Sequence, residues 1–336
     1  FSACATGTHL LLLGDTGQLP PVGHGAVLRD LLRIGVPSGE LTEVHRNGGD
    51  LLAACQVIRE GRRDFQPSQH INLAQGRNRL HVSAGRPQPP VQALERIMGN
   101  VPAGYDPFSD VHVIAATNDS GPVSRKPLNQ LLQGWLNPPA DDEQKKLRFR
   151  VGDKVICTSN CALPVLNEAG EVEQGENGEV ADFVANGELG RVETSDMKEM
   201  RVRFDNPRRT VLVRGDYREA FDLGFATTVH KAQGSQWPVV ICMVDGAGGA
   251  KMICSREWTY TALSRAQTLI VTIGSLDVLR QYCSREVLSR RKTFLVERTK
   301  QLGSRVDSDE QVRSGNLGVG GVESGGDREH AEPLRV

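Results

Sequence analysis

The sequence has no long hydrophobic run. Its longest apolar stretches, Leu10–Leu13 and Pro238–Val244, are far shorter than the roughly 20 residues that cross a bilayer as a helix. No charged-then-apolar leader opens the chain, which starts at Phe1 and which we expect to be a fragment or a processed product. These absences predict a cytoplasmic protein without membrane contact.

Cysteine lacks a pattern as well. The seven cysteines, from Cys4 to Cys283, show no repeated Cys-x-x-Cys spacing, which excludes a disulfide framework and favours a reducing compartment. Cys157 and Cys161 offer one edge of a metal site, but no second Cys or His pair lies near them in the sequence. We therefore expect plain thiols and no metal ligand in this chain.

The sequence also has no excess of positive or negative charge. The net charge is −1, so a surface for nucleic acid would have to be local. Of 40 basic residues, 31 are Arg and nine are Lys. Arginine suits bidentate contacts to phosphate, although GC-rich coding gives the same bias. With 336 residues and 38% hydrophobic side chains, the chain is long enough for two or three ordinary domains.

The order of apolar patterns predicts an α/β core. Runs typical of buried strands occur at Leu10–Leu13, Val111–Ala115, Val239–Val244 and Leu269–Ile273. Amphipathic helical patterns occur at Ala26–Ile34, Asp50–Glu60 and Leu128–Trp135. Strands that alternate with helices favour a parallel sheet.

A different pattern occupies residues 149–218, where short alternating β runs are separated by turns such as Asn177–Gly178 and Asn186–Gly187. It predicts a small antiparallel barrel inserted into the α/β domain, with residues 167–176 as an exposed hairpin tip. Beyond Gly303 large apolar residues give way to Gly, Ser, Asp and Glu. Residues 303–336 are therefore predicted to be a disordered tail.

Three stretches carry the candidate chemistry, and the first is GDTGQLPPVG, residues 14–23. If Leu10–Leu13 is a strand, Asp15 and Gln18 lie at the edge of the sheet where open α/β proteins bind ligands. The Gln18 amide can donate to a phosphate oxygen, and two prolines stiffen its loop. Two alternatives remain open: a turn in which Asp15 and Gln18 only cap their neighbours, and a magnesium-binding strand end.

The second stretch is ATTVHKAQGSQWPVVICMV, residues 226–244. In this stretch many polar side chains surround Gly234, between two apolar runs typical of strands. Hydroxyls, a lysine and backbone N–H groups at such a turn suit a nucleic-acid phosphate. The alternative is a polar surface loop.

The third stretch is REWTYTALSRAQTLIVTIG, residues 256–274. Its pattern predicts a helix with Tyr260 and Leu263 facing inward, followed by Arg265 just before a buried strand. An arginine there can act as an arginine finger, whose fixed charge stabilises the transition state of phosphoryl transfer. A surface ion pair is the alternative.

Together these stretches resemble the superfamily 1 DNA helicases of the RecD-like branch. GDTGQLPPVG with LTEVHRN, then TTVHKAQGSQ, then YTALSRA follow in that order, and the resemblance covers roughly residues 8–275. It implies RecA-like P-loop NTPase motor domains, each an α/β parallel sheet with helices on both faces, and an inserted SH3-like β-barrel. Residues 1–65 would complete the first motor domain, residues 66–148 and 222–300 would form the second, and residues 149–221 the barrel.

The resemblance also implies roles for residues on the ATP side. Gln18 would sense the γ-phosphate while Asp15 orients its loop. Arg46, from LTEVHRN, would contact the γ-phosphate across the domain interface. Arg265 matches the arginine finger, and Gln236 would lie near the ribose.

A second set of residues would contact single-stranded DNA. The coupling motif implies phosphate contacts from Thr228, His230, Lys231, Gln233 and Ser235, and the VIAATN stretch adds Thr117 and Asn118. RNA-directed relatives typically carry an Asp-x-x-Gln-Gly-Arg-Glu type motif instead of His-Lys-Ala-Gln-Gly-Ser, which favours DNA. Movement in the 5′→3′ direction is a further expectation of the resemblance.

The phosphate-binding loop of such motors is absent from this sequence. GAGGAKM, residues 246–252, has Ala250 and Met252 where the second Gly and a metal-binding hydroxyl belong. A strand-borne Asp-Glu pair for Mg²⁺ is absent too. We expect both elements, which hold ATP and Mg²⁺, upstream of Phe1, and we expect residues 1–336 alone neither to bind ATP tightly nor to hydrolyse it.

Several functions fit these motifs. The leading hypothesis is the C-terminal portion of an ATP-dependent DNA helicase acting in recombination or repair. The helicase module of a conjugative relaxase shares the motifs, and an upstream nickase domain with a catalytic tyrosine would distinguish it. Two further hypotheses are a module that binds single-stranded DNA without hydrolysing ATP and a degenerate remnant of a motor. Protein partners are not predicted.

Overall fold

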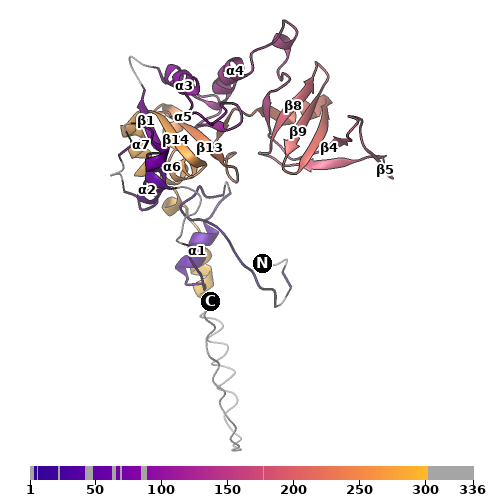
Figure 1. The fold of residues 1–336 in the computed structure, drawn as a ribbon. Helices are drawn as coiled ribbons and strands as arrows, with labels where there is room; N and C mark the ends of the chain where they lie inside the picture. The colour runs from indigo at the N-terminus through magenta and orange to yellow at the C-terminus, as the bar shows by residue number, and fades with distance from the viewer. Residues whose placement is uncertain are drawn as a thin grey trace, which may run out of the picture. The chain divides into compact units, whose positions relative to one another are not determined.

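The computed structural model describes residues 4–5, 7–21, 23–41, 48–62, 66–68, 70–84, 89–176 and 178–301. The chain divides into two compact units. One comprises residues 1–22 and 41–290, and the other comprises residues 23–40 and 291–336. The first unit contains both sheets described below (Figure 1).

A five-stranded parallel sheet forms the centre of the first unit. Its strands are β1 (Arg79–Ser83), β2 (Val111–Ala115), β12 (Ala226–Thr228), β13 (Trp237–Val244) and β14 (Ala266–Gly274). They lie in the order β1-β14-β13-β2-β12, and every neighbouring pair is parallel. The sequence-based prediction of a parallel α/β sheet is confirmed, and β2 has the predicted bounds.

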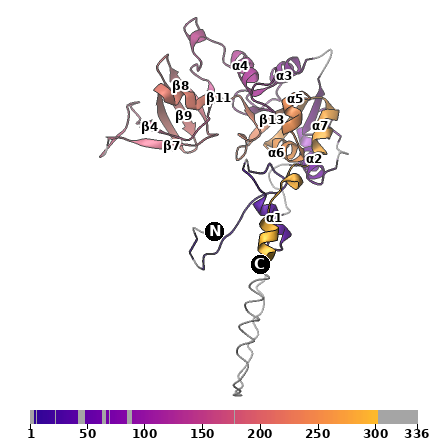
Figure 2. The ribbon, with the colours of Figure 1, turned by 180° about the vertical axis from the view of Figure 1, so that it is seen from behind.

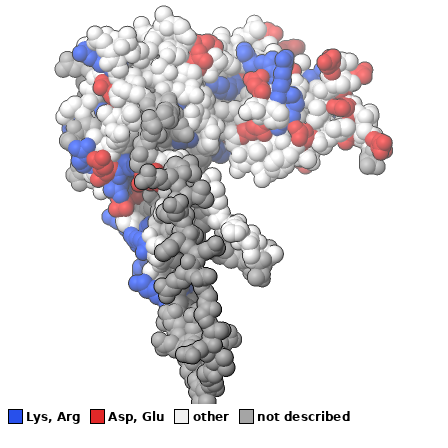
Figure 3. Space-filling model, turned by 60° about the horizontal axis from the view of Figure 1, so that its bottom comes forward, with Lys and Arg blue, Asp and Glu red and all other residues white. Residues whose placement is uncertain are grey.

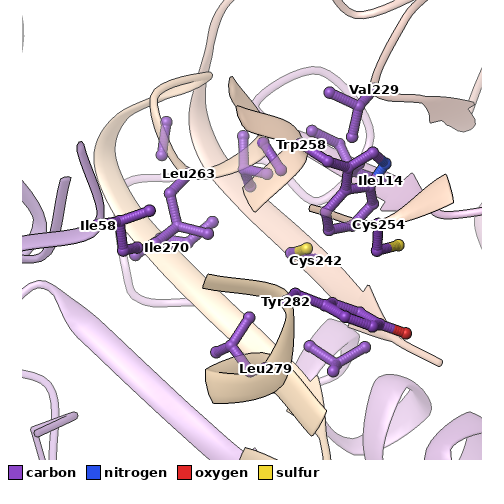
Figure 4. Packing of buried hydrophobic residues seen from close by; sticks show 14 of the residues in the cluster. Ile58, Ile114, Val229, Cys242, Cys254, Trp258, Leu263, Ile270, Leu279 and Tyr282 are labelled. Carbon is purple, nitrogen blue, oxygen red and sulfur yellow. The ribbon is translucent and has the colours of Figure 1, made fainter. Parts of the chain in front are cut away.

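Helices cover both faces of this sheet. One face packs against α2 (Gly49–Arg59), α5 (Gly248–Ile253), α6 (Arg256–Leu263) and α7 (Leu276–Cys283). The other face packs against α3 (Pro90–Met98) and α4 (Arg125–Leu136). Because successive side chains of a strand point to opposite faces, β13 sends Val240 and Cys242 to the first core and Val239 and Ile241 to the second. Figure 4 shows the first core, where Trp258 and Tyr282 pack near Cys242.

A seven-stranded antiparallel sheet follows α4 in the chain. Its order is β11-β3-β8-β9-β10-β4-β7. The bounds are β3 (Lys154–Cys157), β4 (Cys161–Leu166), β7 (Ala181–Val184), β8 (Leu189–Ser195), β9 (Glu199–Asp205), β10 (Arg208–Arg214) and β11 (Phe221–Leu223). A third core fills it, with Phe149, Phe204 and Phe221 fully or almost fully buried. The predicted antiparallel β region is thus present. Of the short pair β5 (Gln174–Gly175) and β6 (Gly178–Glu179), β5 lies in the predicted hairpin tip and β6 follows it.

Charged side chains of both signs are interspersed over the antiparallel sheet, on the right of Figure 3. Ion pairs join Arg203 to Glu193 and Arg214 to Glu179. Arg209 is held between Asp182 and Glu188 at 2.6 and 2.9 Å. These pairs balance the charge of this surface locally, as the near-zero net charge of the sequence suggests.

The second unit contains α1 (Val27–Arg33) and a helical segment at residues 295–301. The predicted helix at Ala26–Ile34 is confirmed, but its most buried side chains are polar: Arg29 and Asp30 pair at 2.7 Å while Val27 is 53% exposed. The Arg291 guanidinium donates to the carbonyls of Gly23 and Gly25, which joins the two segments of this unit.

A few short elements remain in the fold, which Figure 2 shows from behind. Short 3₁₀ helices occur at Leu73–Gln75, Gln144–Lys146, Gly215–Ala220 and Leu288–Arg290. The predicted strand at Leu10–Leu13 is wrong: these leucines are 45 to 87% exposed, because no described strand lies beside them to take their backbone hydrogen bonds. The predicted tail, residues 303–336, lies outside the described residues, and no described helix has the length and hydropathy to cross a membrane.

Candidate nucleotide and nucleic-acid site

The Gln18 loop is a tight turn held together by Asp15. The Gln18 N–H donates to the Asp15 carbonyl at 3.2 Å, and the Gly17 N–H donates to Asp15 Oδ1 at 2.8 Å. Asp15 Oδ2 accepts from Gln18 Nε2 at 3.2 Å and from the Tyr260 hydroxyl at 3.1 Å. Asp15 therefore caps the turn, as the turn hypothesis predicts, and also orients the Gln18 amide.

Arg265 lies directly before β14, at the amino edge of the sheet, and is only 3% exposed. Its Nε donates to the Thr261 carbonyl at 3.1 Å and its Nη1 to the Ser235 carbonyl at 3.3 Å. Its Nη2 contacts Gln18 Oε1 at 3.5 Å. The alternative of a surface ion pair is wrong, because α6 and the Ser235 segment enclose the guanidinium. Two side chains that are 247 positions apart thus meet.

The segment between β12 and β13 crosses from one edge of the sheet to the other. Thr228 ends β12 at the carboxyl edge and Trp237 begins β13 at the amino edge, and both strands run parallel to β2. Along the way Gln233 Nε2 donates to the Leu19 carbonyl at 3.2 Å. At its end Gln236 Oε1 accepts from Gln267 Nε2 at 3.5 Å. One continuous segment therefore joins the candidate DNA residues to the candidate nucleotide residues.

Thr117 and Asn118 follow β2 at the carboxyl edge, next to the end of β12, since Thr228 pairs with Ala115. Arg125 Nε donates to Asn118 Oδ1 at 2.8 Å, and the same guanidinium pairs with Asp222 at 2.8 Å. Thr117 is 5% exposed, and its hydroxyl has no hydrogen-bond partner among the described residues. These side chains form a largely buried polar cluster at the ends of two neighbouring strands.

His230 and Lys231 begin the crossing segment. Partial burial lowers the pKa of His230 below its usual value. Burial, reinforced by the positive charge of Arg125, lowers the pKa of Lys231. Burial is the main cause of both shifts, and Asp222, which pairs with Arg125, partly opposes the shift of Lys231.

The predicted site residues fall into two groups. Hydrogen bonds connect Asp15, Gln18, Arg265, Ser235 and Gln233 near the amino edge. At the carboxyl edge lie Thr117, Asn118 and Thr228. Lys231 lies close enough to Arg125 that the arginine's positive charge lowers the pKa of Lys231. His230 is partly buried but still reaches solvent, and Gln236 contacts Gln267. Arg46 lies outside the described residues.

Sequence inspection overlooked several residues of these contacts. Tyr260 was expected to face inward, and it does pack against the core, but its hydroxyl reaches Asp15. Thr261 Oγ1 accepts from the Leu19 N–H at 2.8 Å. Both belong to the YTALSRA stretch, so their adjacency to Arg265 was a usable signal. No local signal pairs Arg125 with Asp222, which lies 97 positions away.

The donors at the amino edge suit a phosphate, because an amide N–H₂ and a guanidinium both donate to phosphate oxygens. The same region does not offer a metal site, because the described parts of the chain contain no group of three or more His, Cys, Asp or Glu side chains that could hold a metal ion. The Cys157 and Cys161 sulfurs lie 3.7 Å apart, and burial raises the pKa of both thiols. The described residues therefore fit the phosphate of a nucleotide and not its Mg²⁺.

Comparison with known proteins finds similarity to helicases. Residues 223–273 match the UvrD-like helicase C-terminal domain, and residues 1–85 match an AAA domain. The ATP-dependent RecD2 DNA helicase of Deinococcus radiodurans is 28% identical over 89% of this chain and 37% of its own length. The RecBCD enzyme subunit RecD of Mycolicibacterium smegmatis is 26% identical over 88% of this chain and 50% of its own length.

A protein of another kind also matches. The probable conjugal transfer protein TraA of Sinorhizobium fredii is 24% identical over 85% of this chain and 24% of its own length. The chain thus spans between about a quarter and a half of the length of these relatives. The two matched domains and the RecD relatives agree with the resemblance of the ordered motifs to the RecD-like branch of the superfamily 1 helicases.

Proposed function

We propose that this chain is part of a longer ATP-dependent DNA helicase, in which it couples ATP hydrolysis to movement along single-stranded DNA. The observation that carries the proposal is the contact between Gln18 and Arg265, made next to a segment that leads to the opposite edge of the sheet. A motor needs such a path, because hydrolysis at one site must change the grip on DNA at another.

On the nucleotide side, Gln18 senses the γ-phosphate and Asp15 orients it. Arg265 stabilises the charge that develops in the transition state, with Arg46 as a second arginine, and Gln236 lies near the ribose. Bound Mg²⁺ would neutralise the charge of the phosphates. A preorganised guanidinium in a buried position is effective because it needs little reorganisation as charge develops, and Arg265 is 3% exposed.

On the DNA side, Thr117, Asn118 and Thr228 contact the backbone at the carboxyl edge of the sheet. His230, Lys231, Gln233 and Ser235 continue this contact along the crossing segment. The antiparallel sheet is, in this proposal, an SH3-like barrel formed by residues 149–221. Residues 66–148 and 222–300 form the second motor domain, and residues 1–65 belong to the first.

Hydrolysis by the full-length protein tests the proposal. We expect single-stranded DNA to stimulate ATP hydrolysis, and Arg265→Ala to lower kcat by at least about 100-fold, a loss typical when a charge-stabilising donor is removed. Binding of single-stranded DNA, measured by fluorescence anisotropy, should stay within about threefold, because Arg265 contacts protein groups at the amino edge. Unchanged turnover in the variant would remove Arg265 from the site.

The match to TraA supports a second candidate, the helicase module of a conjugative relaxase. Strand nicking by the full-length protein through a catalytic tyrosine would favour it. Binding of single-stranded DNA without any ATP hydrolysis would instead favour a simple binding module. Unwinding assays with 5′ and 3′ single-stranded tails test the expected 5′→3′ direction, and the role in recombination or repair belongs to this same proposal.

A further inference from the structure

Helix α6 fixes the far end of the Gln18 loop. The Leu19 N–H donates to Thr261 Oγ1 at 2.8 Å, and that hydroxyl donates in turn to the Glu257 carbonyl at 2.7 Å within the helix. Thr261 is fully buried. Because the hydroxyl both accepts and donates a hydrogen bond, its orientation is fixed. Leu19 is therefore held at a fixed position along the axis of α6.

The residue before Thr261 fixes the near end of the same loop. The Tyr260 hydroxyl donates to Asp15 Oδ2 at 3.1 Å, and Asp15 Oδ1 accepts from the Gly17 N–H at 2.8 Å. Burial, together with the negative charge of Asp15, raises the pKa of Tyr260 to about 12. The hydroxyl therefore stays protonated at neutral pH and remains a donor to the carboxylate.

Gln18 lies between these two attachments, and its amide has a defined direction. Nε2 faces Asp15 at 3.2 Å while Oε1 faces Arg265 Nη2 at 3.5 Å. Arg265 is bound to the same helix, since its Nε donates to the Thr261 carbonyl at 3.1 Å. The sensor loop and the arginine therefore share a single reference element, the last turn of α6.

We propose that Tyr260 is a positioning residue that sets the distance and orientation of the Gln18 amide relative to Arg265. The proposal rests on the proposed function and adds to it the residue that aligns the two phosphate-contacting groups. Without the Tyr260 hydroxyl, Asp15 keeps only its contacts inside the turn, so the turn can pivot about Leu19. Misplacement of a catalytic group by about 1 Å is enough to slow an enzyme substantially.

The close fit at Gly17 supports this role. A Cβ added there would lie 3.2 Å from Asp15 Oδ1, 3.3 Å from Arg59 Cγ and 3.4 Å from Tyr260 Cε1. The distances to Asp15 and Arg59 are shorter than ordinary van der Waals contacts, and the distance to the Tyr260 ring leaves no spare room, so an added methyl group would displace the Asp15 carboxylate. Gly17→Ala therefore disturbs the same contact from the side of the loop.

The test compares Tyr260→Phe and Gly17→Ala with Tyr217→Phe in the full-length protein. Tyr217 is 48% exposed in the antiparallel sheet region, so its variant controls for loss of a tyrosine hydroxyl. We expect Tyr260→Phe and Gly17→Ala to lower kcat for DNA-stimulated ATP hydrolysis by about tenfold, with the KM for ATP and the Kd for single-stranded DNA within about twofold. A purely structural role would instead lower Tm and leave kcat unchanged.

Amide hydrogen exchange in residues 1–336 provides a measurement that does not depend on ATP hydrolysis. Tyr260→Phe should speed exchange of the Gly17 amide by about fivefold, the value of one lost hydrogen bond, while exchange at Leu19, which Thr261 still holds, and in β13 stays unchanged. Unchanged loop exchange, or a kcat within twofold of the parent in both variants, would overturn the proposal. If the parent shows no DNA-stimulated hydrolysis, the proposed function fails, and loop exchange still decides whether Tyr260 positions Gln18.

Discussion

Lys154 shows at the scale of one residue how a buried charge affects stability. Its Nζ is buried, has no hydrogen-bond partner among the described residues, and lies 5.9 Å from the centre of the Phe108 ring. Burial lowers its pKa from 10.5 to about 8. The folded protein therefore releases this proton more readily than the unfolded chain, and the charged form opposes folding.

The pH dependence of stability follows from these two pKa values. Between pH 8 and pH 10.5 the unfolded chain binds more protons at this site, so the Lys154 contribution to the free energy of unfolding rises with pH across that window. Below pH 8 both states are protonated and the penalty is fully present. Lys154→Met should remove it and raise the free energy of unfolding at pH 7 by about 2 kcal/mol.

Urea denaturation at several pH values measures this effect. The exposed Lys198 provides the control, since Lys198→Met should change the free energy of unfolding by less than about 0.5 kcal/mol. Equal stability of the parent and Lys154→Met at pH 7 would show that the Phe108 contact compensates for the burial of the ammonium group.

At the scale of elements, sequence patterns predicted most of the secondary structure correctly. Val111–Ala115 and the helix at Asp50–Glu60 follow from apolar periodicity, which depends only on local sequence. Leu10–Leu13 has an equally apolar run, yet it is exposed, because a strand also needs a hydrogen-bonded neighbour. Periodicity says nothing about neighbours distant in the chain.

The candidate site shows the same limit. Motif resemblance selected Gln18, Gln233 and Arg265, and they are linked in the structure through Leu19 and each other. It did not select the Tyr260 hydroxyl or the pairing of Arg125 with Asp222, since those contacts depend on how the chain folds back on itself. The role of each selected residue remains a prediction.

The crossing segment between β12 and β13 carries a prediction at the same scale. If Lys231 contacts a DNA phosphate, Lys231→Ala should weaken binding and make the slope of log Kobs against log salt concentration shallower by about 0.7, the contribution of one phosphate in a single strand. Fluorescence anisotropy between about 50 and about 300 mM NaCl, concentrations chosen around physiological salt, gives the slope.

Lys145→Ala is the matched control for this measurement. The Lys145 ammonium is exposed and already pairs with Asp142 at 2.7 Å. Its removal should leave both the slope and the affinity close to those of the parent. An unaltered slope for Lys231→Ala would mean that Lys231 faces solvent or protein in the complex.

At the scale of the whole molecule, the residues proposed to recognise a phosphate occur in a sequence that has no phosphate-binding loop. Gln18 and Arg265 supply donors, but the sequence contains no Gly-x-x-x-x-Gly-Lys-Ser/Thr loop. The most similar segment, residues 246–252, starts after β13 and continues into α5, where Ala250 and Met252 replace the second glycine and the metal-binding hydroxyl. Without backbone N–H groups arranged around the β- and γ-phosphates, binding energy for ATP is small.

Purified residues 1–336 should therefore bind single-stranded DNA in a salt-dependent way and show no ATP hydrolysis of their own. A coupled assay of phosphate release with and without single-stranded DNA measures turnover, and Arg265→Ala prepared in parallel reveals any contaminating ATPase, because contamination is the same in both samples. DNA-stimulated turnover that disappears in Arg265→Ala would contradict the prediction. It would mean that the residues of this chain hold ATP without a conventional phosphate-binding loop.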